Sequence, residues 1–506
     1  MAQYKRSDIT NVFWASNEGF KGGRDPLGIQ NSSIATYSIL LPGLTNLTRH
    51  IRYYSLYCWL LSEYDKLEKN GKTSVHQYNF IRRAELAMAF IMKDQGIGAI
   101  VGALYISQMR YKSPRKGVYE LADGADYNSK DRYWTFKTGA LGQYYLGSLI
   151  YYELVKMEEG RFYLRNKGKE LANALRNSVK TNVRDLFIEC ILEGRISESE
   201  IKVLQPLAIH KIAMNSEEWI YLNHLMTKTD DESSFRKETV YLLLRDLDNG
   251  KTVEDFARNR FLHVNDESQI GASFGWYFYY LCECLHYCID SIFCLALNMM
   301  HDLHNPPMQE LSQEIVESIL IELATEKKYK TVEEWKKSVT NDIVTLYDQL
   351  RNAIRNQEYI QAAVYSLKLL LRLHNEFEKN DKAILDFENN NDLRRQRGIL
   401  SEGLKAYISQ YLSWSIPKYI KNLVAQIMQE HTIIAIGKMG NNNSDLRKFI
   451  LDDGRAVLVE IRYPVETSPR VTSLFNYLQD LNYLDVNKNN ELTEIAYKYI
   501  GDYGKE

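Results

Sequence analysis

One segment of the 506-residue chain constrains the fold more than any other, because it is apolar on almost every side. It spans residues 273–302 and contains the run WYFYYLCECLHYCIDSIFCLALNMM. A helix that is hydrophobic all round is typical of a position surrounded by other protein or by lipid. No stretch of the chain approaches about 18 uninterrupted apolar residues, the length of a membrane span. The segment therefore predicts the central buried helix of a larger helical protein.

The residues that most often interrupt helices are scarce. The chain has 27 glycines and 9 prolines, fewer than the usual shares of about 7% and about 5%. Apolar residues recur with helical spacing along most of the sequence, and strand-like runs are short and few. We therefore predict an all-α fold, mainly helical with small β wings. The expected helices are 32–41, 45–67, one that Thr73 or Ser74 caps and Gly96 ends, 182–193, 197–204, 216–227, 234–247, 252–260, 273–302, 308–325, 331–353, 358–379, 398–412 and 417–430.

The start of the chain and its cysteines predict a cytoplasmic protein without a membrane partner. The opening MAQYKRSDITNVFW lacks a basic head followed by an apolar run. The chain has six cysteines, too few for its length to form a disulfide framework. A reducing compartment fits this usage.

Four of the cysteines lie in the segment 273–302, beside a histidine, and this grouping suggests zinc. At about 100° per residue, however, Cys282 and His286 share one face of a helix, while Cys284 and Cys288 share another. A single straight helix cannot direct all four side chains to one tetrahedral ion. We therefore predict buried core cysteines, no metal site and no cofactor.

The helical rhythm is interrupted in the same way at two places. At 138–178 a helix leads into a short hairpin with its turn at residues 158–160, and a new helix follows. At 469–501 the same order recurs, with a polar turn at Asn487–Asn490 and Thr493 as the cap of a last helix. Both segments resemble the end of a winged helix, in which a hairpin follows the third helix. The resemblance covers about 40 residues at each place.

The net charge of −2 hides two parts of opposite charge. Residues 1–184 hold 27 Lys and Arg against 16 Asp and Glu, and the remaining residues hold 36 against 49. Such asymmetry favours an acidic partner for the first part, or docking between the two parts. We predict three domains: a basic helical domain, 1–184, that ends in a winged-helix-like element; a helical core, 185–440; and a C-terminal winged-helix-like domain, 441–506.

A basic strip follows the first hairpin and predicts contact with nucleic acid. Residues 161–184 hold seven basic residues and one acidic residue, Glu170. Side chains on a wing can reach phosphates, where released counterions supply affinity without sequence information. The preceding helix offers only Gln143 to read base edges, so we expect contact with DNA or RNA that is independent of sequence. The alternative is a solvated basic surface. The residues proposed for binding are Arg161, Arg165, Lys167, Lys169 and Arg176.

The C-terminal hairpin has the wrong sign for a polyanion. Residues 450–506 hold six basic and ten acidic residues. A winged helix of this charge is better suited to contact with a protein. The alternative is a cap that only stabilises the fold.

Four arginines near the amino end sit on or beside helices rich in aromatic residues. They are Arg49, Arg52, Arg82 and Arg83. An arginine removed from water needs a carboxylate or phosphate partner. Glu63 and Glu85 are possible partners inside the fold. The alternative is an anion pocket that these arginines line, and with Glu85 it would serve an unrecognised enzyme.

Motifs of known catalytic sites do not appear in the sequence. There is no G-x-S-x-G elbow, no H-E-x-x-H pair and no dinucleotide-binding glycine pattern. We assign no catalytic residue, and a non-enzymatic role is the favoured interpretation.

The run LLPGLTNLTRHIRYYSLYCWLL, followed by RRAELAMAF, resembles uncharacterised helical proteins of bacterial anti-phage defence loci. The resemblance covers about 70 residues. It implies operation beside an ATPase or nuclease made by a neighbouring gene. Together with the charge pattern, it predicts an adaptor or scaffold subunit of a multi-component complex. The alternatives are a pure protein-interaction scaffold and the enzyme considered above.

Overall fold

The computed structural model describes residues 25–93, 95, 100–109, 117–227, 235–263, 271–324, 329–393, 408–439 and 446–504. Within these ranges the protein is mostly helical, and its strands form small two-stranded antiparallel sheets. This confirms the predicted mainly helical class. The chain divides into two compact units, which are described separately.

The division differs from the three consecutive domains expected from the sequence. Unit 1 consists of Met1–Ile39 and Ala257–Pro469, and unit 2 consists of Leu40–Phe256 and Arg470–Glu506. Each unit is thus built from two separate stretches of chain. The helices of 470–504 belong to the unit that holds the basic hairpin, and the last of them, Glu494–Tyr503, packs there on the helix Arg236–Asp248.

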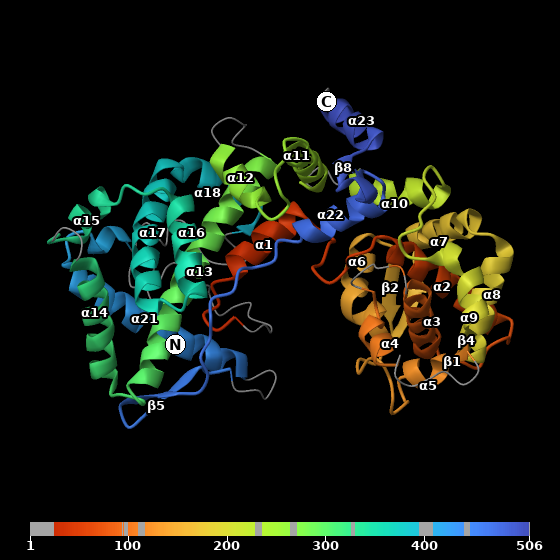
Figure 1. Ribbon diagram of the computed structural model, residues 1–506, viewed down its shortest axis with the longest axis horizontal. Helices are drawn as coiled ribbons and strands as arrows, with labels where there is room; N and C mark the ends of the chain where they lie inside the picture. Colours follow the sequence, from red (N-terminus) through yellow and green to blue (C-terminus); the bar gives the residue numbers. More distant parts are fainter. Residues whose placement is uncertain are drawn as a thin grey trace. The chain divides into compact units, whose positions relative to one another are not determined.

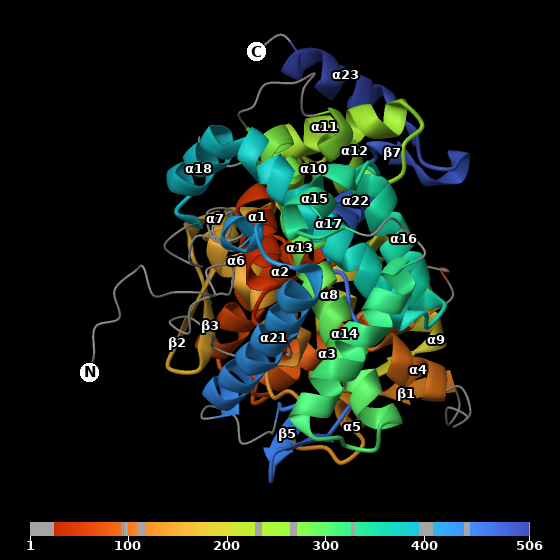
Figure 2. The ribbon, with the colours of Figure 1, turned by 90° about the vertical axis from the view of Figure 1, so that its left-hand side faces the viewer.

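Unit 1 is a helical bundle (Figures 1 and 2). Helix α13 packs along α17, and α17 also packs against α16. Helices α14 and α21 each pack against α13 and against one another, and α14 also packs against α17. The elements are α1 (Asn31–Leu40), α12 (Phe256–His263), α13 (Ala272–Asp302), α14 (Met308–Ala324), α15 (Val332–Ser338), α16 (Ile343–Arg355), α17 (Tyr359–Lys379), α18 (Asp381–Asn390), α21 (Ile416–Met439), β5 (Phe449–Asp452) and β6 (Arg455–Leu458).

Helix α13 is the buried central helix that its composition predicts. Every residue from Ala272 to Leu297 is buried. Of the helices in the described part of the chain, it alone is long and apolar enough to cross a bilayer, and its most apolar stretch is entirely covered by protein. Core helices pass this test as readily as membrane spans do. The four cysteines on α13 are buried free thiols, as predicted.

The predicted single helix 331–353 is wrong. Two helices occupy this stretch, because two caps lie within it. Thr331 accepts a hydrogen bond from the backbone N–H of Glu334 at the start of α15, and Asp342 accepts one from Thr345 at the start of α16. Such side chains satisfy free amides of a first turn and so begin a helix. Residues 398–407 of another expected helix lie outside the described residues.

Unit 2 contains both predicted hairpins, the first one near residue 160 and the acidic C-terminal one near residue 488. Helix α2 packs on α7, α7 packs on α10, and α11 packs on α23. The elements are α2 (Arg52–Lys69), α3 (Gln77–Met92), α4 (Ala103–Met109), β1 (Val118–Glu120), α5 (Leu121–Ala125), η3 (Leu141–Tyr145), α6 (Leu146–Tyr151), β2 (Val155–Glu158), β3 (Arg161–Leu164), α7 (Asn166–Ser178), α8 (Thr181–Glu193), β4 (Arg195–Ser197), α9 (Glu198–Val203), η4 (Gln205–Leu207), α10 (Glu217–Thr227), α11 (Arg236–Asp248), α22 (Val471–Asp480), β7 (Leu484–Asp485), η5 (Val486–Lys488), β8 (Glu491–Leu492) and α23 (Glu494–Tyr503).

The first hairpin is joined to its two flanking helices by a short set of backbone hydrogen bonds. Helix α6 ends through Glu153, whose φ of 56° lies in the left-handed region. The N–H of Leu154 then donates to the carbonyl of Leu149 at 2.9 Å, a typical helix stop. After the hairpin, the N–H of Arg165 donates to the carbonyl of Leu154 at 2.9 Å and begins the approach to α7.

The C-terminal hairpin repeats this framework. Asn482 has a φ of 60° after α22, and the N–H of Tyr483 donates to the carbonyl of Leu478 at 2.9 Å. The N–H of Thr493 donates to the carbonyl of Tyr483 at 3.0 Å, just before α23. The predicted second hairpin is therefore present, and the two helix–hairpin–helix segments share one backbone design.

Candidate nucleic-acid interface

The first hairpin forms where the sequence predicts its turn. Glu158 pairs with Arg161, which leaves Glu159 and Gly160 as a two-residue loop with φ values of 49° and 78°. Positive φ at both central residues gives the turn whose twist matches that of paired strands. Lys156 lies opposite Tyr163. Because strand side chains alternate, Lys156 and Glu158 of β2 lie on the same face of the hairpin as Arg161 and Tyr163 of β3.

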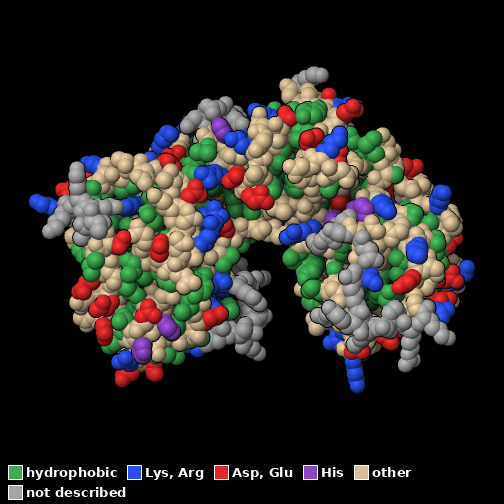
Figure 3. All heavy atoms as spheres, in the orientation of Figure 1, with side chains coloured by type: hydrophobic (Ala, Val, Ile, Leu, Met, Phe, Trp, Pro, Cys, Tyr) green, Lys and Arg blue, Asp and Glu red, His purple; other side chains and the backbone are tan. Residues whose placement is uncertain are grey.

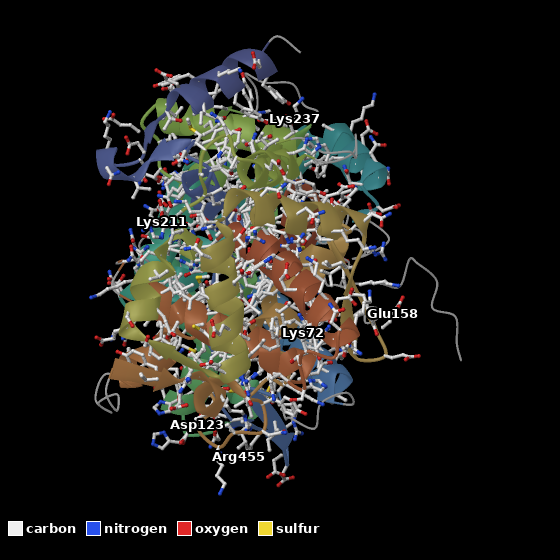
Figure 4. The ribbon with its side chains drawn as sticks, turned by 90° about the vertical axis from the view of Figure 1, so that its right-hand side faces the viewer. Lys72, Asp123, Glu158, Lys211, Lys237 and Arg455 are labelled. Atoms are coloured by element: carbon white, nitrogen blue, oxygen red, sulfur yellow. The ribbon has the colours of Figure 1, made fainter. Side chains whose placement is uncertain are left out.

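Two neighbouring side chains of α3, Gln77 and Tyr78, attach the hairpin to that helix. The Gln77 amide donates to the carbonyl of Phe162 at 2.9 Å and accepts from the N–H of the same residue at 2.9 Å. Gln77 and Phe162 are both buried. The Tyr78 hydroxyl donates to the carbonyl of Gly160 at the turn. These contacts hold the hairpin in place, and Figures 2 and 4 show its tip, with Glu158 labelled in Figure 4, projecting outward from unit 2.

A groove of about 350 Å³ lies between α2, the hairpin and the start of α7. Its lining is strongly basic, with one carboxylate, that of Asp65. The aromatic ring of Tyr163 is also part of the lining. The five cations of this basic groove are Lys66, Lys69, Lys156, Arg161 and Lys169.

The strongest ion pair at the basic groove joins Arg161 to Glu68. The guanidinium reaches the two carboxylate oxygens at 2.9 and 2.7 Å. This hydrogen bond raises the pKa of Arg161. The two side chains are 38% and 41% exposed, and ion pairs at such positions contribute only about 0–1 kcal/mol. A phosphate can therefore compete for Arg161 at little cost.

The remaining cations of the groove form ion pairs only at exposed positions or have no ion-pair partner among the described residues. Lys156 pairs with Glu158 at 2.8 Å, and both side chains are exposed. Lys66 pairs with Glu63 at 3.3 Å and Lys69 pairs with Asp65 at 2.7 Å, both along one helix. Such pairs stabilise a helix by only about 0.3–0.5 kcal/mol. Lys169 is exposed and has no ion-pair partner in the parts of the chain that are described.

The structure brings only part of the predicted basic strip to this groove. Arg161 and Lys169 line it, and Arg165 is exposed just before α7. Lys167 pairs with Glu153 at 3.0 Å and lines a different pocket, between α7 and α10. Arg176 is held against α2 by Glu63 at 2.7 Å, with both side chains about 20% exposed. Three groove cations were not predicted. Lys66 and Lys69 lie on α2, which is distant in sequence, and Lys156 lies on β2, just before the basic strip.

On the face drawn in Figure 3, basic and acidic side chains are interspersed. Within unit 2 several of the cations in residues 1–184 pair with carboxylates, among them Lys167 with Glu153 and Arg176 with Glu63. The groove differs from this pattern because its lining has five cations and a single carboxylate.

Arg52, one of the four arginines expected either to pair inside the fold or to line an anion pocket, has a complete set of internal partners. Its Nε and Nη2 each donate to one oxygen of Glu218 at 3.0 Å. Its Nη1 donates to the carbonyls of Pro206 and Ala208 at 3.0 and 2.8 Å. Arg52 and Glu218 are almost entirely buried. The arginine therefore has an internal carboxylate, and that carboxylate is not one of the two expected from the sequence.

Arg82 and Arg83 also bind within the protein. The Arg82 guanidinium donates to the carbonyls of Ala125, Phe136 and Trp134, the last two at 2.5 and 2.8 Å. Arg83 forms two hydrogen bonds of 2.7 Å with the carboxylate of Asp126. Each side chain thus ties α3 to the segment that follows β1.

The four arginines do not converge on one pocket. Arg49 is exposed, and the other three point to separate partners. Of the two expected carboxylates, Glu63 pairs with Lys66 and Arg176. The geometry therefore favours internal pairing over an anion pocket for these arginines.

Glu85 has a structural environment that sequence reasoning did not reveal. Its carboxylate accepts hydrogen bonds from Tyr57 at 2.8 Å, from the backbone N–H of Leu141 at 2.9 Å and from Tyr133. Burial raises the pKa of Glu85, and these hydrogen bonds act against the increase. The carboxylate lies at the start of the π-helical turn η3 and satisfies its free amides. The group is 1% exposed, so its place is in the core.

A Ser–His–Glu arrangement in unit 1 has the wrong proton position for catalysis. The Nε2 of His374 lies 3.1 Å from the hydroxyl of Ser409, and Nδ1 lies 3.3 Å from Glu378. However, the Lys336 ammonium lies 2.7 Å from Nδ1, and an ammonium can only donate. Nδ1 is therefore the acceptor, and Nε2 carries the proton and donates to Ser409. A histidine in this state cannot activate the serine as a base.

A buried acidic cluster surrounds His286 on α13. Its Nδ1 lies 3.5 Å from Glu283, its Nε2 lies 3.7 Å from Asp290, and Nε2 is 3.0 Å from the carbonyl of Val465. Burial lowers the pKa of His286, but the two carboxylates outweigh this effect and raise it to about 9. Burial raises the pKa of Asp290, whose oxygens accept no hydrogen bond from the described residues. The imidazolium is thus stabilised inside the core.

Comparison with protein-family models, with curated proteins and with solved structures finds no match. The part of the chain that is described contains no group of three or more His, Cys, Asp or Glu side chains that could hold a metal ion. The lining of the basic groove, with five cations and one carboxylate, has a charge that suits an anionic ligand.

Proposed function

We propose that the protein is a non-enzymatic adaptor that contacts DNA or RNA, independently of sequence, through the basic groove of unit 2. The observation that carries the proposal is the lining of this groove, with five cations and one carboxylate beside an exposed hairpin. Lysine and arginine side chains that approach a phosphate backbone release its condensed counterions, and this release supplies affinity.

The proposal takes the hairpin as the wing of a winged helix. Three features support this use: the tight two-residue turn, the helix on each side, and the exposed cations Arg165 and Lys169 at the start of α7. The helix before the hairpin gives little means of reading bases. The Gln143 side-chain oxygen already accepts a hydrogen bond from the indole of Trp134 at 2.7 Å. Because this helix offers few groups that could read bases, binding through the phosphate backbone of the nucleic acid is the consistent mode.

The resemblance to proteins of anti-phage defence loci gives the adaptor its proposed setting. In that setting it is one subunit of a bacterial complex and works beside an ATPase or nuclease. The same backbone framework with a different charge supports a second contact surface in unit 2. In the C-terminal hairpin Asp485 is partly exposed, Glu491 and Glu494 are exposed, and Val486 is 62% exposed. This surface is proposed to bind a protein subunit with a basic face.

The experiment measures binding of the full chain to a fluorescein-labelled 20-nucleotide DNA, its duplex and the matching RNA by anisotropy, between 50 and 200 mM salt. The expected result is a linear fall of log affinity with log salt, with a slope of about −0.7 to −0.9 for each phosphate contacted. The variant Lys156→Glu/Arg165→Glu/Lys169→Glu is expected to bind at least tenfold more weakly at 50 mM salt, with a shallower slope. Arg161 is left intact because a glutamate at this position would lie beside the carboxylate of Glu68.

The matched control reverses three other exposed lysines of unit 2, Lys202, Lys211 and Lys251. It makes the same change in net charge away from the groove. If the two triple variants lose affinity equally, the groove is not the binding surface. If the unmodified protein binds none of the three probes at 50 mM salt, the proposed function is wrong.

A further inference from the structure

Tyr163 is an aromatic side chain placed on the charged face of the hairpin. It is 38% exposed, on strand β3. The other aromatic residue of this strand, Phe162, points to the opposite face and is 2% exposed. Burial in the hydrophobic core therefore accounts for Phe162 and does not account for Tyr163.

Two cations of the groove lie directly beside the Tyr163 ring. The Lys156 ammonium lies 5.9 Å and the Arg161 guanidinium lies 5.7 Å from the ring centroid. An exposed ring and cations this close match the two parts of a nucleotide, its flat base and its phosphate. Proteins that bind single strands combine these elements, a cationic path for the backbone and aromatic rings on which bases stack.

From this arrangement we infer that the groove selects an unpaired strand, with one base stacked on Tyr163 while neighbouring phosphates meet Lys156, Arg161 and Lys169. The inference rests on the proposed function and adds the class of nucleic acid to it. In a duplex both faces of a base are covered by its neighbours, so a ring at the side of a hairpin has no free base to stack on. An unpaired strand presents the base face and the phosphate together.

The two contributions have different signatures. A stacked base adds affinity without displacing counterions, whereas a phosphate contact adds affinity and steepens the salt dependence. Loss of Tyr163 is therefore expected to weaken binding at every salt concentration and to leave the slope unchanged. Loss of the groove cations is expected to change both.

The test compares binding of the full chain to a labelled 20-nucleotide thymidine strand and to its duplex with the adenosine strand. The unpaired strand is expected to bind more tightly than the duplex. Tyr163→Ala is expected to weaken binding to the unpaired strand about fivefold or more, with an unchanged salt slope. Tyr163→Phe keeps the ring and is expected to bind as the unmodified protein does. A single 2-aminopurine in the strand is expected to be quenched by the protein and less so by Tyr163→Ala.

The matched control is Met157→Ala, which removes a side chain that is 42% exposed on the opposite face of the same hairpin. It is expected to leave binding unchanged, and melting temperatures check that both variants are folded. Should Tyr163→Ala not fold, Tyr163→Leu, which removes the ring but keeps apolar area, takes its place. Equal affinity for strand and duplex, or no loss on removal of the ring, overturns this inference and leaves the proposed function standing. Binding to neither probe overturns both.

Discussion

The buried pair of Arg52 and Glu218 is expected to dominate the stability of unit 2. In Glu218→Gln the guanidinium loses its countercharge while it remains buried, with both side chains 3% exposed or less. Removing one partner of such a pair costs about 3–5 kcal/mol, because the other charge is left without compensation. For a unit of about 250 residues, each kcal/mol shifts the melting temperature by about 2–4 °C. The expected decrease is therefore about 6–20 °C.

The measurement is differential scanning calorimetry of the full chain and of three variants, Arg52→Met, Glu218→Gln and the double variant. The double variant removes both charges, so it is expected to cost no more than the worse of the two single variants. The carbonyls of Pro206 and Ala208 lose their donors in Arg52→Met, so that variant remains destabilised. The reasoning is refuted if Glu218→Gln lowers the melting temperature by less than about 3 °C, or if the two single effects add in the double variant.

Three further predictions concern pH, packing and thiol reactivity. The pKa of His286 is raised to about 9, so the stabilisation by its positive charge is complete below about pH 6.5 and is lost as the pH rises through about 9. The melting temperature of unit 1 is therefore expected to fall over this range. An equal fall in the melting temperature of a His286→Gln variant would contradict the assignment. Gly168→Ala is expected to lower the free energy of unfolding of unit 2 by about 1–3 kcal/mol, because a Cβ at this position would lie 2.0 Å from the carbonyl oxygen of Leu154. Urea unfolding measures this change, and an unchanged midpoint of the urea transition would argue against the close approach. The six cysteines are buried, and burial raises the pKa of each of the Cys58, Cys284 and Cys288 thiols. Ellman's reagent is therefore expected to react slowly with the native protein, whereas in guanidinium it is expected to react with all six thiols. Rapid reaction of the native protein would show that the core opens.

Much of the local structure could be predicted from the sequence, because its causes are local. The apolar run 273–302 requires burial on every side, and α13 is the buried centre of unit 1. Glu159-Gly160 between two alternating strands predicts the tight turn of the first hairpin. The second hairpin is found where its polar turn is expected. Errors in helix boundaries, such as the stretch 331–353, come from caps whose single hydrogen bonds outweigh a continuous apolar pattern.

The candidate site was only partly predictable, since two of its five cations come from a helix about 90 residues earlier in the chain. Arg161 and Lys169 belong to the basic strip, but Lys66 and Lys69 join them only because α2 packs against the hairpin and α7. The sequence of the basic strip also predicted more cations available for a ligand than the structure has, because carboxylates of the same unit pair with some of them. Arg176 belongs to the strip, but its guanidinium is held in an ion pair by Glu63 of α2.

The amino-acid sequence by itself determined that the chain is helical, that α13 is buried and that two hairpins follow helices, since each depends on residues close together in the chain. Only the tertiary structure decided that the first segment of the chain belongs to unit 1 and the last segment to unit 2. It also decided that Arg52 and Arg83 pair with internal carboxylates and that five cations line one groove. These outcomes depend on which helix faces pack together. That choice is made by the burial of apolar surface across the whole unit, and no single segment carries it.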